Sequence, residues 1–256
     1  MTLGVDHIVI AVSELDQAVR DYRDLGFTVI PGGVHANKAT HNALICFGDG
    51  TYIELLARTG AVPAPDMLDF SPLLDKGEGL AGFALGSDNL EADAARLKAN
   101  AFSHIEIAPG ERRRLDGTII RWKLMHIDGS FTPFFIQDLT PRNLRVPDDS
   151  NVTTHANRVV GLRGVKMLVR SIDAAVEHYT RLLGLQPRER QARDYQEIEL
   201  SRGSLILSQP GQETSTALPD GAGGVLYAVE VLQDHASDNR FTLDKTHNVR
   251  FEQSPD

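Results

Sequence analysis

The 256-residue sequence has little sulfur chemistry, since it contains a single cysteine, Cys46. One cysteine cannot form an intrachain disulfide, which excludes a disulfide-stapled secreted scaffold and favours a reducing compartment. No apolar run approaches the roughly 20 residues that a membrane-spanning helix requires, and no basic segment followed by an apolar one opens the sequence. We therefore expect a cytoplasmic protein without a membrane partner.

Positive charge is also scarce, because 26 Lys and Arg residues face 35 Asp and Glu residues and the formal net charge is -9. Nucleic-acid binding requires an excess of clustered Lys and Arg, so we expect no nucleic-acid partner. The tight basic run Arg112-Arg113-Arg114 lies between turn signals at Pro109-Gly110 and Asp116-Gly117, and we expect a solvated loop there. The sequence also lacks a glycine-rich phosphate loop and a Gly-x-Ser-x-Gly elbow, which removes the usual signals of nucleotide chemistry and serine hydrolysis.

What the sequence does contain is a repeated strand-helix pattern. Each copy has a short apolar run, a polar break and an amphipathic helix. The pattern is clearest at 5–22 and 164–179, and a weaker copy occupies 82–97. Internal repetition at this scale identifies the building block of the fold.

Hairpin signals complete the repeated unit. The segments 40–47 and 51–57 flank the turn Gly48-Asp49-Gly50 and predict a β-hairpin after the first helix. With a short strand at 28–30, the first copy becomes a βαβββ module. The same module is expected twice more, over 81–138 and over 160–209.

These modules divide the chain into regions. We expect paired βαβββ modules with the main cleft over 1–142, a polar linker over 143–157, and a third module with a truncated fourth over 158–256. The fourth is expected to hold one strand, 225–231. The predicted class is α+β. Exposed sheet edges in an incomplete fourth module favour a homodimer.

Strand alternation assigns a face to each polar residue. His7 points away from the first helix, and Glu54 and Tyr52 point the same way as His7 from the second arm of the hairpin. A carboxylate in so apolar a strand costs several kcal/mol unless it has a partner. A histidine on the same surface supplies one, either as a hydrogen-bonded imidazole or as a fellow metal ligand. We therefore take His7 and Glu54 as candidate catalytic residues.

Other residues are candidate substrate contacts. A two-residue hairpin loop places His41 on the cleft face, whereas a loop longer by one residue presents Asn42 instead. Trp122 is either a core residue or part of an apolar pocket wall together with Phe135 and Tyr52. A small-molecule ligand is the partner that such a pocket implies.

The sequence resembles the vicinal oxygen chelate superfamily, and within it the glyoxalase-like domain proteins. The resemblance rests on Asp6-His7-Ile8-Val9-Ile10-Ala11-Val12, on Gly48-Asp49-Gly50-Thr51-Tyr52-Ile53-Glu54-Leu55 and on Pro133-Phe134-Phe135-Ile136, and it covers most of residues 3 to 210. It implies a glyoxalase/bleomycin resistance/dioxygenase-like fold, in which repeated βαβββ modules form cupped, partly open barrels.

The resemblance also implies a chemistry. In that superfamily the first and last strands of each module supply metal ligands, which fall on His7 and Glu54 here. The second module departs from the pattern because Gly82 cannot coordinate, and Gln137 offers a weaker amide ligand. The implied protein is a lyase or isomerase whose divalent ion (Zn, Ni, Mn, Fe or Mg) polarises a substrate carbonyl, while Glu54 or a bound water moves the proton.

Two alternatives remain open. The missing ligands at Gly82, Gly164 and Leu207 favour a metal-free protein of the same fold that binds or sequesters a small molecule. Ring cleavage by iron held by two histidines and one carboxylate is disfavoured, because the aligned positions offer only one histidine.

Overall fold

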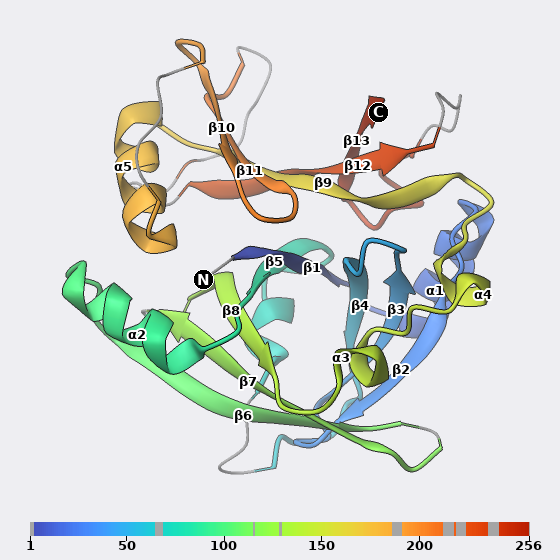
Figure 1. Cartoon of the computed structure of the whole chain (residues 1–256). Helices are drawn as coiled ribbons and strands as arrows, with labels where there is room; N and C mark the ends of the chain where they lie inside the picture. Colours follow the sequence, from blue (N-terminus) through green and yellow to red (C-terminus); the bar gives the residue numbers. More distant parts are fainter. Residues whose placement is uncertain are drawn as a thin grey trace.

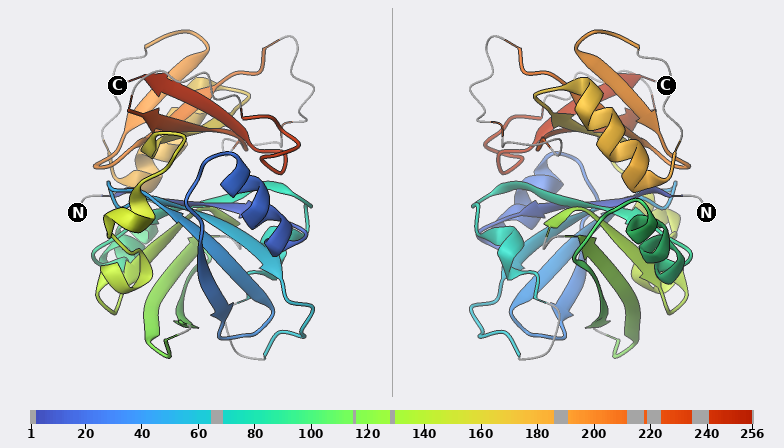
Figure 2. Two further views of the ribbon diagram at one scale, coloured as in Figure 1. Left: turned by 90° about the vertical axis from the view of Figure 1, so that its right-hand side faces the viewer. Right: turned by 90° about the vertical axis from the view of Figure 1, so that its left-hand side faces the viewer.

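The structure is a computed structural model, and it describes residues 3–64, 69–114, 116–127, 130–185, 191–211, 218, 224–234 and 241–255. The chain forms an eight-stranded closed barrel and a five-stranded sheet that lies across one side of it (Figure 1). Figure 2 shows the same two parts from the sides. The predicted α+β class is confirmed.

The barrel contains the two predicted βαβββ modules. Their elements are β1 (Gly4–Ala11), α1 (Leu15–Asp24), β2 (Ile30–His35), β3 (Thr40–Cys46), β4 (Tyr52–Arg58), the 3-10 turn η1 (Ser71–Leu74), β5 (Gly79–Gly86), α2 (Leu90–Ala99), β6 (Ile105–Arg113), β7 (Ile119–Ile127) and β8 (Ser130–Asp138). The strand order around the barrel is β1-β4-β3-β2-β6-β7-β8-β5. A short β2–β6 pairing, Val34 with Arg113 and His35 with Arg112, joins the modules on one side and closes the barrel.

The second part follows two short helices. Its elements are α3 (Arg142–Arg145), α4 (Ser150–Thr153), β9 (Val159–Leu168), α5 (Ile172–Leu183), β10 (Tyr195–Glu199), β11 (Ser204–Ser208), β12 (Val225–Gln233) and β13 (Arg250–Pro255). The strand order is β10-β11-β9-β12-β13. The stretch expected as a linker therefore contains α3 and α4, and β13 adds a parallel strand that the sequence did not predict. The boundaries 1–142 and 158–256 and the homodimer stay predictions.

Alternation along each barrel strand separates two apolar layers. In β1, Ile8 and Ile10 face the main core, which the barrel wall shares with the second sheet and its helix. Val9 faces the barrel interior, where it meets residues such as Leu124 and Phe134. His7 lies on the same interior side as Val9. The barrel wall thus buries its outer face under the second sheet and leaves its inner face for a site.

None of the helices in the described ranges is both long and apolar enough to span a membrane.

Candidate functional site

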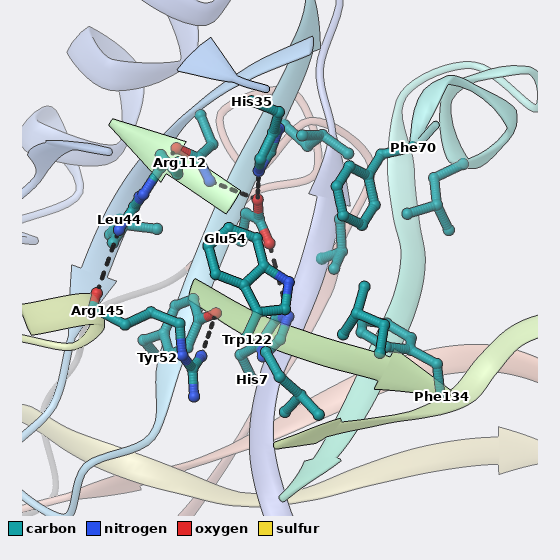
Figure 3. Close-up of a pocket in the computed structure, with 16 residues that line it drawn as sticks. His7, His35, Leu44, Tyr52, Glu54, Phe70, Arg112, Trp122, Phe134 and Arg145 are labelled. Carbon is teal, nitrogen blue, oxygen red and sulfur yellow. Dashed lines mark hydrogen bonds and ion pairs between the residues drawn. The ribbon is translucent and has the colours of Figure 1, made fainter. Parts of the chain in front are cut away.

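Two adjoining cavities lie at the barrel, an inner one and an outer one whose lining includes the exposed side chains of Glu106, Arg121 and Leu139. The inner cavity has a volume of about 30 Å³, which is room for a water-sized group. The outer cavity has a volume of about 770 Å³, which is in the range of small-molecule sites. His35, Phe70 and Trp122 line both cavities. Most of the polar side chains that line the inner cavity come from the first module (Figure 3). The full set of polar lining residues is His7, His35, Asn42, Tyr52, Glu54, Arg112 and Arg145.

His7 and Glu54 meet inside the barrel, as strand alternation predicts. The strands β1 and β4 are parallel neighbours. Both residues are buried, since His7 is 2% and Glu54 is 8% exposed. His7 Nε2 lies 3.5 Å from Glu54 Oε2. Asn42 Nδ2 donates to the other carboxylate oxygen, Oε1, at 2.6 Å. The carboxylate therefore has a fixed orientation in the cavity.

Asp6 and Arg145 hold His7 from behind. His7 Nδ1 lies 2.7 Å from Asp6 Oδ1, and Arg145 donates to both oxygens of Asp6 at 3.0 and 3.1 Å. Burial alone would raise the pKa of Asp6, but Arg145, His7 and Arg142 together hold it well below its ordinary value. Because ionised Asp6 can only accept, His7 Nδ1 carries a proton.

The contact between His7 and Glu54 joins two groups that can each accept a proton. Nε2 of a neutral His7 and Oε2 of an ionised Glu54 would face each other as two acceptors. A proton held by either atom converts that contact into an attractive one. The ring of His7 is further fixed by stacking on Tyr52, with ring centroids 4.4 Å apart, and by the edge-on contact with Phe134 at 5.5 Å.

His35 is a second histidine at Glu54, and no ligand-type spacing marks it in the sequence. Its Nε2 lies 3.7 Å from Glu54 Oε1, and its Nδ1 lies 2.9 Å from Thr40 Oγ1. Burial lowers the pKa of His35 to about 4, so the ring is neutral near pH 7. The glycines at 32 and 33 look like a turn in the sequence, but they belong to β2, which extends to His35.

Arg112 is also part of the site, so the prediction of a solvated loop at 112–114 was wrong for this residue. Arg112 is 4% exposed and lies in β6. Its Nη1 donates to Asn42 Oδ1 at 3.2 Å, and its Nη2 donates to the carbonyl of Arg145 at 3.3 Å. Burial lowers the pKa of the Arg112 guanidinium, whereas Asp6 and other groups raise the pKa of Arg145 against the effect of burial.

The hairpin register decides between His41 and Asn42. Leu44, rather than Ile45, pairs with Glu54, because the turn between β3 and β4 is longer than two residues. Asn42 consequently lines the inner cavity. His41 lies at the alternate position of β3 and does not line it, so His41 is wrong as a substrate contact in this cavity.

Two predictions in β8 fail for a similar reason. Phe134 and Ile136 line the inner cavity, whereas Phe135 is buried in the main core outside the barrel. Gln137 accepts from the N–H of Leu90 at 3.1 Å and donates to the carbonyl of residue 88, so it caps the start of α2. The predicted alignment of β8 on β4 therefore assigned the wrong face of β8 to the cavity. Tyr52 and Trp122 do line the inner cavity, and their role as substrate contacts stays a prediction.

The residues present do not fit the metal ion that the resemblance implies. In β5, the residues paired with Val9 and His7 are Gly82 and Ala84, and β8 presents Phe134 and Ile136, so these two strands offer no ligand to the inner cavity. His7 and His35 approach different oxygens of Glu54 rather than a common point. Within the described ranges, no three or more His, Cys, Asp or Glu side chains are arranged to hold an ion. The second histidine therefore does not restore the iron alternative.

Comparisons with known proteins agree with the fold. The family model described as glyoxalase-like domain matches residues 5–183. A hypothetical protein from Staphylococcus aureus superposes with a TM-score of 0.74 at 17% identity, over 99% of each chain. A mutant of 4-hydroxymandelate synthase from Streptomyces coelicolor superposes with a TM-score of 0.53 at 13% identity, over 92% of this chain and 72% of that one. The search of curated proteins finds no match.

Proposed function

Because the chain belongs to the glyoxalase-like domain family, we propose that it is an enzyme that moves a proton at a carbon next to a carbonyl group of a small molecule, in a reaction of lyase or isomerase type. The observation that supports this is the buried Glu54 carboxylate, which lines the inner cavity beside His7. General acid-base catalysis uses such an arrangement, in which a buried carboxylate lies beside a second titratable group.

The two cavities suggest how a substrate would sit. The body of a small molecule occupies the outer cavity, and its carbonyl group enters the inner one past Trp122 and Phe70. Glu54 then accepts the proton of the adjacent carbon, and the C–H electron pair moves to the carbonyl oxygen to give an enolate. The reverse transfer, to the same or a neighbouring carbon, completes an isomerisation, and loss of a leaving group completes a lyase reaction.

Two neighbours of Glu54 have a part in this transfer. Asn42 holds Oε1, which orients the carboxylate toward the substrate. His7 Nε2 lies at Oε2 and can share the abstracted proton, while Asp6 fixes the His7 tautomer. The buried apolar walls, which include Leu124 and Phe134, exclude water and strengthen the electrostatic interactions inside.

The test is solvent deuterium exchange, followed by NMR, into a panel of 2-oxoaldehydes, 2-hydroxyketones and 2-oxo acids. We expect the wild-type protein to catalyse exchange at the carbon next to the carbonyl of at least one class. Glu54→Gln should lower that rate by about 10²-fold or more. Glu91→Gln, at an exposed carboxylate on α2, is the matched control and should not change it.

A metal-free binding protein is the second candidate, and the apolar wall that the second module presents to the inner cavity favours it. Binding of a panel compound without any exchange would select this candidate. Equal exchange rates in the wild type and in Glu54→Gln would contradict the proposed role of Glu54.

A further inference from the structure

Among the described residues, Arg112 is a buried cation with no carboxylate in direct contact, although the charge of Glu54 raises the pKa of the guanidinium against the effect of burial. Within the described part of the chain, no carboxylate lies within ion-pairing distance of its guanidinium, and its Nε has no hydrogen-bond partner. Buried arginines are normally paired, because an unpaired buried charge and an unsatisfied buried donor both cost free energy. A ligand that carries negative charge would relieve both costs.

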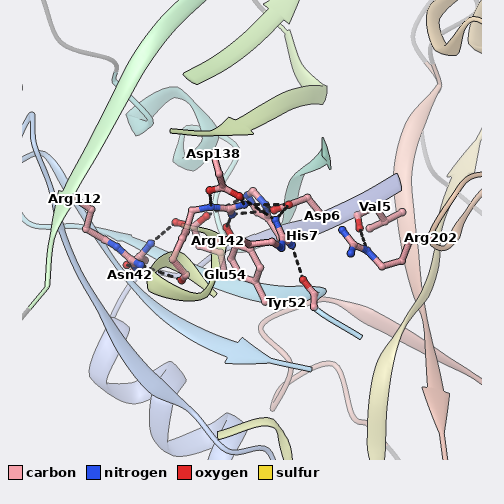
Figure 4. A network of polar contacts seen from close by, with 12 residues as sticks. Val5, Asp6, His7, Asn42, Tyr52, Glu54, Arg112, Asp138, Arg142 and Arg202 are labelled. Atoms are coloured by element: carbon pink, nitrogen blue, oxygen red, sulfur yellow. Dashed lines mark hydrogen bonds and ion pairs between the residues drawn. The ribbon is translucent and has the colours of Figure 1, made fainter. Parts of the chain in front are cut away.

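The charged groups behind His7 already satisfy one another. Arg145 donates to both Asp6 and Asp138. Arg142 donates to the same two carboxylates (Figure 4). Neither of these acids forms a hydrogen bond with Arg112. The charge of Arg112 is therefore directed at the cavity rather than at the network behind His7.

Arg112 and the candidate base border the same small space. Arg112 Nη1 donates to Asn42 Oδ1 at 3.2 Å, and Asn42 Nδ2 donates to Glu54 Oε1 at 2.6 Å. A single amide thus connects the cation to the base, as Figure 4 shows. The cavity that both residues line has room for a water-sized group, such as one carbonyl oxygen.

The backbone of β2 is shaped around this guanidinium. A Cβ atom at Gly32 would lie 2.6 Å from Arg112 Nη1 and 1.9 Å from Asn42 Oδ1. No side chain larger than hydrogen fits there, so glycine allows the strand to pack directly over both groups. The guanidinium is consequently held in place before any ligand binds, which is the condition for electrostatic stabilisation of a developing charge.

We propose that Arg112 is the oxyanion-binding residue of the inner cavity and takes the place that the family resemblance gives to a metal ion. Its Nε–H donates to the carbonyl or carboxylate oxygen of the substrate. In the proton transfer proposed above, on which the catalytic part of this inference rests, the electron pair of the broken C–H bond moves to that oxygen. Arg112 stabilises the resulting negative charge, and the pair returns when the proton is replaced, so no further reactant is required.

The first experiment measures anion binding without any enzyme activity. Trp122 is the single tryptophan and lines the inner cavity, so its fluorescence reports on occupancy. The probes are formate and its neutral isostere formamide. We expect the wild type to bind formate about tenfold or more tightly than formamide. Arg112→Gln should lose this preference, and Arg112→Lys, which keeps a buried charge but lacks the Nε donor, should keep only part of it.

Arg113→Gln is the matched control, because Arg113 is the next residue of β6, is exposed, and donates to the carbonyl of Gly117. It should bind formate as the wild type does. Equal formate affinity in the wild type and in a folded Arg112→Gln or Arg112→Lys variant would overturn the proposal. Formate binding that depends on Arg112, without proton exchange in any compound, would support the anion site and contradict the proposed function instead.

The second experiment separates arginine from metal in the wild-type protein. We expect excess chelator to leave the exchange rate unchanged and Arg112→Gln to lower it by about 10²-fold or more. Loss of exchange in chelator, with recovery when Mn²⁺ or Zn²⁺ is added back, would overturn the proposal, because the ion would then supply the positive charge.

Discussion

At the scale of single residues, Asp6 is the centre of the polar network behind His7. It is fully buried and contacts His7, Arg142 and Arg145. Asp6→Asn removes the negative charge that Arg142 and Arg145 face, so the buried charge of Arg145 loses one of its compensating carboxylates. We expect the variant to lose about 3 kcal/mol or more of unfolding free energy, measured by urea denaturation. Asp24→Asn, at an exposed carboxylate, should change it by less than about 0.5 kcal/mol.

His35 should make the stability depend on pH. Burial lowers the pKa of His35 in the folded state to about 4, against an ordinary value of 6.5. Below pH 6.5 the unfolded chain therefore binds a proton that the folded chain does not, and stability falls as the pH drops toward 4. The loss is roughly 3 kcal/mol over that window.

The measurement is urea denaturation of the wild type and of His35→Gln at several values between pH 7 and pH 4. The wild type should lose stability faster than the variant as the pH falls, because His155 and His178, whose pKa values burial also lowers, contribute equally to both proteins. Parallel curves for the two proteins would contradict a buried neutral His35.

Single residues also show where prediction from sequence succeeds. His7 and Glu54 could be predicted to converge because each lies in an apolar strand whose alternation fixes its direction. Arg112 and Arg145 could not, because no apolar alternation surrounds them and their partners lie far away in the sequence. A charge run in a polar segment looks the same whether its residues are solvated or buried by a distant strand.

At the scale of elements, β6 depends on a glycine that the sequence analysis took for a turn. Gly110 pairs with Trp122 across β6 and β7, and a Cβ atom there would lie 2.1 Å from the indole nitrogen. Gly110→Ala must displace Trp122, which lines both cavities. We expect a loss of about 1 to 3 kcal/mol in stability and a shifted tryptophan emission.

Gly48→Ala is the control for this substitution, since a Cβ atom at Gly48 would meet nothing within 4 Å. Its stability and its emission spectrum should match those of the wild type. An unchanged emission maximum in Gly110→Ala would mean that β6 moves in place of the indole, and would contradict the assignment of Gly110 as the space that Trp122 requires.

Register is the element property that sequence patterns define least. The existence of β1, α1, β3, β4, α2 and β8 was predicted correctly, because apolar periodicity marks each of them. The turn between β3 and β4 is longer than two residues, so Asn42 lines the cavity in place of the predicted His41. In β8, Phe134 lines the cavity in place of the predicted Phe135. Since the side-chain period of a strand is two, such an error moves every residue to the other face.

At the scale of the whole molecule, the two barrel modules share a topology and differ in what they present to the interior. The first supplies His7, Glu54 and most of the other polar groups, and the second supplies apolar residues such as Phe134 together with Arg112. Repetition in the sequence therefore predicts the architecture, which depends on the apolar faces that both copies keep. It does not predict the site, which depends on the positions at which the copies differ.

The barrel and the second sheet should unfold together. The main core includes Ile8 of the barrel and Val165 of β9 in one apolar cluster. The turn between β10 and β11 also bonds to β1, because the N–H of Val5 donates to the carbonyl of Arg202 at 2.8 Å and Arg202 Nε donates to the carbonyl of Val5 at 2.9 Å. Neither part can separate without exposing apolar surface of the other, so we expect one cooperative transition.

Two signals test this cooperativity during denaturation. Trp122 fluorescence reports on the barrel alone, and far-ultraviolet circular dichroism reports on both parts. The two midpoints should coincide, and Arg202→Ala should lower both by the same amount, because it removes a bond between the parts rather than within either. If circular dichroism changed at a lower denaturant concentration than the fluorescence, the second sheet would be a separate unit, and the predicted boundary at 143–157 would also be a boundary of stability.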